Sequence, residues 1–334
     1  MTGASNAHAP LVSAVVVNWN GERDLGISIP SLLEQTYPRM EVVVVDNGSD
    51  DNSRNVAQRM GVRWIPLGRN HGLAGALNHG AAVSEGEFLL FLNNDMRFDP
   101  DFVTELVGVL SNAPELFGVD AKQFDWEGKQ VVHSRTSLRR TRWPSGEIPG
   151  WEFAQFPAHE PSVCLMGSAA NLLVRKEMFD ALRGWDVDYP VGWEDVDLCW
   201  RAWMRGWGLC YVPTAICWHR VGASMSTNAG ARARMRGSFS GRLRFSTRFL
   251  PWRYVIGAWS LSYAGIVKAI VGGRYSDAVG RARIVAECTA RIPSNLRQRR
   301  RMFHEANITP GSQWREMVKR EAMKSTEPMG RERV

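Results

Sequence analysis

The sequence lacks the paired cysteines of a disulfide framework or of a zinc site. Its five cysteines stand at positions 164, 199, 210, 217 and 288, and none of them belongs to a CxxC pair. An odd number at this spacing favours reduced thiols in a cytoplasmic setting. Residues 1–10 also lack the charged start and apolar core of a signal peptide, so we expect no export.

Two further absences exclude particular classes of protein. No GxGxxG motif follows the first apolar run, Leu11–Val17, so the phosphate cradle of a Rossmann dehydrogenase is missing. The longest uncharged run in the C-terminal part, Tyr254–Val267, has 14 residues, fewer than the roughly 20 that span a bilayer. With 44% hydrophobic residues in 334, the sequence predicts a folded globular protein without a membrane span.

Positive charge is concentrated at one end of the chain. Residues 231–334 carry 22 Lys and Arg against 7 Asp and Glu, whereas the preceding 230 residues carry 19 against 27. The acidic front part therefore needs a metal or a local basic pocket to hold an anion. The basic back part suits anionic lipid or nucleic acid.

Short apolar runs alternate with helical spacing through the first half of the chain. We expect buried strands at 11–17, 41–45, 62–67 and 87–92, and this alternation predicts an α/β fold with a mostly parallel central sheet. Three of these strands end in Asn or Asp, where ligands collect in an open α/β sheet. The alternative is that these Asn and Asp residues only turn the chain.

A second group of carboxylates opens a predicted helix that begins at Glu194. Asp197 is interpreted as an i, i+4 partner of Arg201 on that helix. Asp195 follows a turn rich in Gly and Trp, which is typical of a pocket wall. His219 again lies at the end of a predicted strand, which favours a site over an isolated surface histidine.

Residues 125–163 contain four prolines, several aromatic residues and a basic run. We expect a long, partly ordered excursion at the edge of the site, since long loops are usually functional or disordered.

Six motifs lie at ordinary spacing across residues 11–226. They are Val16-Val17-Asn18-Trp19-Asn20, Val45-Asp46-Asn47-Gly48-Ser49, Asn70 to Gly80, Asn93-Asn94-Asp95, Gly184-Trp185-Asp186 with Trp193 to Leu198, and His219 to Ser224. Each motif is weak alone, but together and in this order they resemble the inverting family 2 glycosyltransferases of GT-A fold, in particular their rhamnosyltransferase-like branch.

The resemblance implies a GT-A (nucleotide-diphospho-sugar transferase) fold, a nucleotide-sugar donor and a Mn²⁺ or Mg²⁺ ion. Asn93-Asn94-Asp95 occupies the place of the family's DxD motif, with Asn at the first position. Asp95 and His219 would therefore be the metal ligands, and the histidine favours Mn²⁺. Metal affinity is then expected to depend on the bound donor.

The remaining roles follow from the same resemblance. Asp195 would be the general base that takes the acceptor's proton. Asp46 would accept the N3–H of uracil or thymine. Further donor contacts are implied for Asn18, Asn70, Gly72, Asn78, Asn94, Trp193 and Glu194.

The C-terminal part has three segments of helical spacing with apolar stripes and Arg-rich faces, at 239–250, 252–272 and 276–292. Basic amphipathic helices suit a membrane surface. The alternatives are that they pack on the catalytic domain or in a homodimer; nucleic-acid binding lacks any recognised module. We therefore expect a peripheral protein at the inner face of the cytoplasmic membrane.

These patterns predict a GT-A catalytic domain over residues 1–228 and a basic amphipathic α-helical extension over 229–334. The expected activity is inverting, metal-dependent transfer of a sugar to a glycan or lipid-linked acceptor in cell-surface polysaccharide synthesis, with L-rhamnose from dTDP-rhamnose as the favoured donor. A UDP-hexose donor is the first alternative. The second is a non-catalytic membrane or nucleic-acid adaptor, motivated by the incomplete DxD motif.

Overall fold

The computed structural model describes residues 9–189, 192–220 and 228–322, without the side chains of 228–235 and 320–322. The last motif of the sequence analysis therefore continues, at Val221 to Ser224, outside the described residues. The chain forms two compact units. Unit 1 consists of residues 1–136 and 155–237, and unit 2 of residues 137–154 and 238–334.

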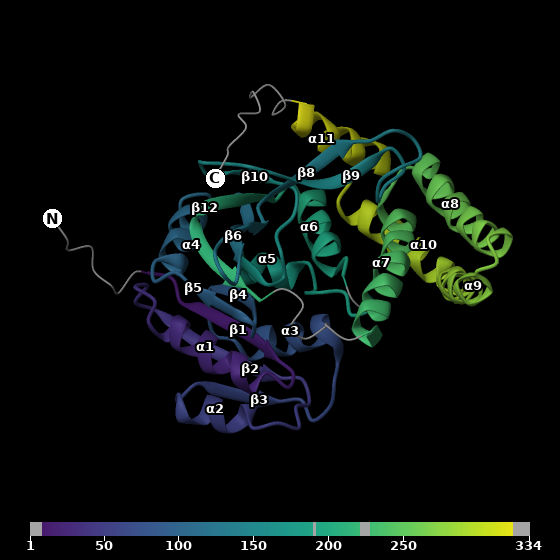
Figure 1. Ribbon diagram of the computed structural model, residues 1–334. Coiled ribbons are helices and arrows are strands. Elements are labelled where there is room, and N and C mark those ends of the chain that lie inside the picture. The colour runs from purple at the N-terminus through teal and green to yellow at the C-terminus, as the bar shows by residue number, and fades with distance from the viewer. Residues whose placement is uncertain (1–8, 190–191, 221–227, 323–334) are drawn as a thin grey trace. The chain divides into compact units, whose positions relative to one another are not determined.

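Unit 1 is an α/β unit whose N-terminal half follows the predicted alternation (Figure 1). The four strands expected in this half are all present, each within one or two residues of its predicted bounds. The elements are β1 (Val12–Asn18), α1 (Glu22–Leu33), β2 (Met40–Asp46), α2 (Ser53–Arg59), β3 (Arg63–Pro66), α3 (Gly72–Val83), β4 (Phe88–Asn93), β5 (Met96–Phe98) and α4 (Phe102–Ser111).

The second half of unit 1 completes the sheet. Its elements are β6 (Leu116–Asp125), β7 (Val131–His133), β8 (Arg135–Arg140), β9 (Trp151–Phe156), β10 (Ser162–Cys164), β11 (Asn171–Arg175), α5 (Lys176–Ala181), α6 (Glu194–Met204) and β12 (Gly208–His219), although most of the β8–β9 hairpin belongs to unit 2. Strand β12 ends at His219, which therefore lies at the end of a strand as predicted.

The central sheet has the order β10-β12-β6-β11-β4-β1-β2-β3. Strands β3, β2, β1 and β4 are parallel, as are β6 and β12, which confirms the mostly parallel centre. Strand β11 runs antiparallel between β4 and β6. The carboxyl ends of β1, β2 and β4 therefore meet at one edge, which is where the polar residues after these strands lie.

Helices cover both faces of this sheet. Val12, Ala14 and Val16 of β1 face a core that includes residues of α1, α2 and α4. Val15 faces α3 on the other side, where Gly80 approaches so closely that a Cβ would lie 2.3 Å from the Val15 Cγ1. Successive side chains of a strand point to opposite faces of the sheet, so one apolar run packs against the helices on both faces.

The expectation of a partly ordered excursion at 125–163 is wrong. This segment forms β7 and β10, which join the central sheet, and the hairpin β8–β9. The four prolines lie outside these strands, so each strand keeps its backbone donors.

Unit 2 is helical apart from the hairpin segment 137–154. Its helices are α7 (Asn228–Phe249), whose residues up to 237 belong to unit 1, α8 (Trp252–Val271), α9 (Tyr275–Ala290), α10 (Ile292–Glu305) and α11 (Pro310–Ala322). The hairpin packs within this unit through the aromatic pairs Phe153–Phe245 and Trp151–Trp314. The sequence predicts a domain boundary at residue 228. That boundary would separate the hairpin segment 137–154 from the helices with which it forms unit 2.

Candidate active site

The ends of β1 and β2 place Asn18 beside Asp46 in register. The Asp46 carboxylate is 7% exposed and accepts the Ser49 N–H, at 3.2 Å to Oδ1 and 3.3 Å to Oδ2. The turn between them contains Gly48 at φ +86°, and a Cβ there would lie 2.8 Å from the backbone of Arg69. The turn thus fixes Asp46 at the edge of the sheet.

A buried amide pair joins the ends of β1 and β4. Asn94 Nδ2 donates to Asn18 Oδ1 at 2.7 Å, and Asn18 Nδ2 donates to Ser49 Oγ at 3.1 Å. A Cβ at Gly21 would lie 1.9 Å from the Asn94 amide nitrogen, so only glycine leaves room for this pair. Asn18 and Asn94 therefore hold neighbouring loops together in this structure.

Asn70 organises the start of α3. Its Oδ1 accepts the Gly72 N–H at 2.8 Å and the Asn47 Nδ2–H at 3.2 Å. Gly72 has φ +74°, a conformation that glycine adopts at little cost. This loop continues the polar edge formed by the ends of β1 and β2.

Asn78 has a clear structural function. Its Nδ2 donates to the Trp185 carbonyl and its Oδ1 accepts the Trp185 N–H, both at 2.9 Å. The amide thereby mimics a backbone pairing and holds the Gly184–Asp186 turn against α3. The nucleotide contact implied for Asn78 stays a prediction.

The structure brings together Asp95 and His219, which are 124 positions apart in the sequence. Strands β5 and β12 pair Met96 with His219, and His219 Nε2 lies 3.1 Å from Asp95 Oδ1. Both side chains are largely buried, with 7% of the Asp95 and 15% of the His219 side chain exposed.

A second polar pair orients the imidazole. Gln123 donates its Nε2–H to Asn171 Oδ1 at 2.9 Å, so its Oε1 is left as an acceptor for His219 Nδ1–H at 3.1 Å. This assignment rests on the hydrogen-bond network. In the neutral imidazole it directs the Nε2 lone pair toward Asp95, which is the arrangement of a metal-binding histidine with an outer partner.

The donor set fits a divalent cation that has other ligands besides protein. One carboxylate and one imidazole are present, and no group of three or more His, Cys, Asp or Glu that could hold a metal occurs among the described residues. Asp24 and Arg220 form an ion pair at 2.6 Å, and the charge of Asp95 contributes to raising the pKa of Asp24 after burial, the main cause. The remaining ligands would have to be oxygens of a bound molecule or water.

The carboxylates at the start of α6 are held by an unusual turn. Trp193 precedes the helix at φ +74°, which is a strained conformation for a bulky residue. Burial, and then the adjacent Asp195 carboxylate, raise the pKa of Glu194 to about 8. Its Oε2 is buried without a hydrogen-bond partner among the described residues, which fits a neutral carboxyl group.

Asp195 lies in a different electrostatic setting. Burial is the largest cause and raises the net pKa of Asp195, although the Val196 N–H, which donates to Oδ1 at 2.8 Å, and the His133 side chain act in the opposite direction. Of the two carboxyl groups, Asp195 is the one with an imidazole nearby that favours its charged form. Two adjacent carboxyl groups with different surroundings can divide acid and base functions.

His133 and Asp120 form a buried ion pair beside this helix, with Nε2 and Oδ2 2.7 Å apart. Burial lowers the pKa of His133, but the Asp120 charge and hydrogen bond outweigh it, so the net pKa is raised. Asp120 is fully buried and also accepts the Ser168 N–H at 3.0 Å. Neither residue is among the site residues predicted from the sequence, although a carboxylate inside the apolar run of β6 is a detectable signal.

Strand β6 links the two groups of site residues. Asp120 interacts electrostatically with Asp195, and Gln123, three residues on and roughly 10 Å along the strand, contacts His219. The structure thus pairs Asp95 with His219 directly, whereas the convergence of Asp195 with them stays a prediction.

Asp197 is a structural residue, as predicted. Arg201 Nε donates to its Oδ2 at 2.7 Å, one helical turn away. Arg201 also donates to the carbonyls of Leu182 and Gly184. The pair anchors α6 to the turn that Asn78 holds.

The sheet, with its polar carboxyl edge and its Asp–His pair, defines a GT-A type nucleotide-diphospho-sugar transferase fold. Solved structures with this likeness include a mannosyltransferase from Pyrobaculum calidifontis in complex with GDP-Man and Mn²⁺ (TM-score 0.53, 16% identity, 86% of this chain and 88% of that one). Another is S. aureus TarS (TM-score 0.53, 16% identity, 92% of this chain and 91% of that one). At this identity the likeness shows the fold alone.

The model of glycosyl transferase family 2 matches residues 13–182, and the chain belongs to this family of glycosyltransferases. Relatives include an uncharacterized glycosyltransferase of Rickettsia felis, 36% identical over 43% of this chain and 24% of the relative. The O-antigen biosynthesis protein RfbC of Myxococcus xanthus is 32% identical over 62% of this chain and 17% of the relative. The chain thus spans about a quarter or less of the length of these two relatives.

Proposed function

We propose that this glycosyltransferase acts with inversion and depends on a divalent metal. The observation that carries the proposal is the oriented Asp95–His219 pair at the carboxyl edge of the sheet. Mn²⁺ in the complexes of the P. calidifontis mannosyltransferase and of GalNAc-T7 supports a divalent ion in this fold. Mn²⁺ is our first choice, because imidazole suits it better than Mg²⁺.

Asp95 and His219 would hold the ion together with donor diphosphate oxygens and water. When bound, such an ion stabilises the negative charge that grows on the departing nucleoside diphosphate. Its affinity for the free protein is expected to be low, since the chain supplies one carboxylate and Asn93 stands where a second could be. This explains why donor and metal should bind together.

Asp46 would select the base of the donor. Uracil and thymine present an N3–H donor and cytosine does not, so a carboxylate acceptor favours uridine or thymidine donors. Asn18, Asn70, Gly72 and Asn94 belong to the loops at the same edge and would hold the nucleotide either directly or by fixing these loops. Asn78 would contribute to donor binding through the Gly184–Asp186 turn that it holds.

Asp195 would act as the general base. The acceptor oxygen forms its bond to the anomeric carbon as Asp195 takes the hydroxyl proton, and the bonding electrons of the broken C–O bond leave with the diphosphate. Glu194, protonated at neutral pH, would donate a hydrogen bond to the sugar or acceptor, and Trp193 would contact an apolar sugar face.

For the substrates we favour L-rhamnose from dTDP-rhamnose and a glycan or lipid-linked acceptor in cell-surface polysaccharide synthesis, at the inner face of the cytoplasmic membrane. The relatives named for O-antigen biosynthesis and for poly-beta-1,6-N-acetyl-D-glucosamine synthesis in Staphylococcus epidermidis support a polysaccharide product. A UDP-hexose donor is the second candidate, because Asp46 accepts uracil as readily as thymine.

The test is release of nucleoside diphosphate from a panel of nucleotide sugars with Mn²⁺, with Mg²⁺ and with chelator. We expect release that requires the ion and that falls by about 10²–10⁴-fold in Asp195→Asn, the usual contribution of a general base. Asp180→Asn is the matched control, because it makes the same change at an exposed position of α5. Full activity in chelator, or in Asp195→Asn, would refute the mechanism; a UDP-hexose as best donor would correct the sugar alone.

A further inference from the structure

Helix α8 is apolar on two opposite sides. One side packs inside unit 2, where Ala258 contacts a small core with Leu243 of α7 and Val285 of α9. The other side is exposed, and we call it the α8 surface. Its residues and their exposed fractions are Trp252 55%, Ile256 64%, Tyr263 52%, Val267 58%, Ile270 47% and Val271 83%, with Ser260 among them.

The spacing of these residues makes the α8 surface continuous. They recur at intervals of three and four positions, so they lie on one side of the helix over nearly its whole length. A helix on the surface of a soluble protein normally presents charged residues there. Two further apolar residues are exposed on the first turns of α9, Tyr275 (67%) and Val279 (51%).

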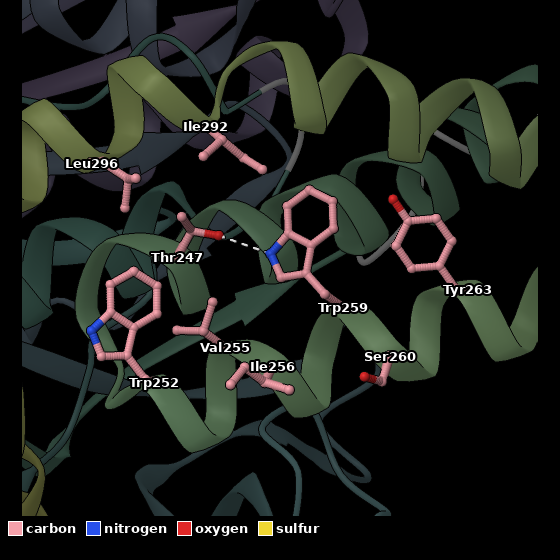
Figure 2. A pocket seen from close by; sticks show the side chains of 9 residues that line it. All are labelled: Thr247, Trp252, Val255, Ile256, Trp259, Ser260, Tyr263, Ile292 and Leu296. Carbon is pink, nitrogen blue, oxygen red and sulfur yellow. Dashed lines mark hydrogen bonds between the residues drawn. The ribbon is translucent and has the colours of Figure 1, made fainter.

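An apolar groove opens along one edge of the α8 surface and shares Trp252, Ile256, Ser260 and Tyr263 with it (Figure 2). It has a volume of about 310 Å³ and is lined by side chains of α7, α8 and α10: Thr247, Trp252, Val255, Ile256, Trp259, Ser260, Tyr263, Ile292 and Leu296. Trp259 Nε1 donates to Thr247 Oγ1 at 3.1 Å, so these two polar groups of the groove are already hydrogen-bonded to each other. A sugar or nucleotide would find few partners here, whereas a hydrocarbon chain needs none.

Positive charge borders this patch near both ends of α8. The helix contains Arg253 and Lys268 and no acidic residue, and the Arg299 guanidinium lies 4.9 Å from the centre of the Trp252 ring. Asp277, on α9, is already paired with Arg274 and Arg281. An apolar strip bordered by cations matches a surface of anionic lipid.

We propose that the α8 surface binds an anionic lipid bilayer and that the adjacent groove takes a hydrocarbon chain of a bilayer lipid. A second copy of the chain is the less suitable occupant, because a symmetric contact through this face would bring the two basic borders together. This binding does not depend on the proposed reaction.

Helix α8 is also long and apolar enough to cross a membrane by length and composition alone, with 28% of its most apolar window buried. The 14-residue estimate from the sequence considered only the uncharged run, whereas the helix also includes Arg253 and Lys268 near its ends. A protein bound along the bilayer surface is released from vesicles by alkaline carbonate, whereas a protein whose helix crosses the bilayer is retained.

The experiment is vesicle flotation with the full chain, using phosphatidylcholine alone and phosphatidylcholine mixed with phosphatidylglycerol. We expect binding to the mixed vesicles, reduced by roughly tenfold or more in Ile256→Glu, which places a charge in the apolar layer. Arg253→Gln with Lys268→Gln should weaken binding to the mixed vesicles by roughly fivefold per removed cation. Leu33→Glu is the matched control, because it puts the same charge on an equally exposed apolar residue of unit 1 (53%) and should bind like the wild type.

Four results would overturn the proposal. One is absence of wild-type flotation with the mixed vesicles, and another is equal flotation of the wild type and Ile256→Glu. The third is a wild-type dimer in light scattering without lipid that Ile256→Glu converts to a monomer, since a second copy would then cover the face. The fourth is retention on vesicles in alkaline carbonate, since α8 would then cross the bilayer, whereas release supports surface binding. Circular dichroism of each variant verifies that it is folded.

Discussion

The raised pKa of Glu194 makes a quantitative prediction about stability. Glu194 is 6% exposed, and burial, with the neighbouring Asp195 charge, moves its pKa from 4.5 to about 8. In the unfolded chain the group loses its proton near pH 4.5, whereas in the folded protein it keeps the proton to about pH 8. The contribution to stability is therefore fully present below pH 4.5 and is lost as the pH rises toward 8.

The size of this loss follows from the shift. Between pH 5 and pH 8 the two states differ over about three pH units, and each unit corresponds to about 1.4 kcal/mol, so the free energy of unfolding should fall by about 4 kcal/mol. Glu194→Gln keeps the shape of the protonated carboxyl group and cannot ionise. The variant should therefore lack this part of the pH dependence and should be more stable than the wild type at pH 8.

The assay is urea unfolding of wild type and variant at pH 5 and pH 8. Hydrogen exchange of the backbone amides in β1 and β4 reports the unfolding of unit 1 specifically. Subtracting the free energies of unfolding of the two proteins at each pH cancels the contribution of other titrating groups, including His133. Glu34→Gln makes the same change at an exposed position and serves as the control. If wild type and Glu194→Gln lose the same free energy between the two pH values, Glu194 is ionised in the folded protein and the assignment of acid and base at α6 fails.

Three further predictions concern other parts of unit 1. Gln123→Leu removes the acceptor that orients His219, and Mn²⁺ affinity in the presence of nucleoside diphosphate should fall about 10–100-fold by paramagnetic resonance titration; unchanged affinity would contradict the role of Gln123. Asn78→Ala leaves the Trp185 backbone without two hydrogen bonds and should lower the free energy of unfolding by about 1–3 kcal/mol in urea, whereas a loss near zero would show that water replaces the amide. Gly48→Ala meets both a positive φ and the Arg69 backbone at 2.8 Å, so it should cost about 1–3 kcal/mol, while Gly26→Ala in α1, with open space around it, should be neutral or stabilising; equal thermal midpoints for the two variants would refute the steric argument.

The sequence predicts the N-terminal half of the fold because local and global signals agree there. Apart from Ser13, Val12 to Val17 and Val42 to Val45 are apolar on both faces, which is what a parallel strand between two helical layers requires. The polar residues after these strands follow from the same topology. Asp95 and His219 needed the resemblance as well, because nothing local to either residue indicates pairing between β5 and β12.

The rest depends on contacts that are distant in the sequence. Gln123 matters because the ladder of β6 and β12 brings its amide to His219, and no local pattern shows that register. The sequence around the hairpin β8–β9 favours a loop because it contains prolines and a basic run. Its aromatic side chains find their partners 92 and 163 residues later, Phe153 with Phe245 and Trp151 with Trp314. Likewise, His133 appears ordinary until the fold places Asp120 beside it.

The assignment of residues 137–154 to unit 2 affects how the protein can be dissected. The path of the chain enters that unit, returns, and enters it again, so neither unit is a continuous stretch of sequence. A truncation before α7 would delete the helices but leave the hairpin behind, with Trp151 and Phe153 deprived of Trp314 and Phe245. Such a fragment would expose aromatic rings that are covered in the intact protein. Its aggregation or its binding to lipid would therefore not report on the native molecule. Point substitutions on the intact chain are therefore the sound way to separate the two activities proposed for it.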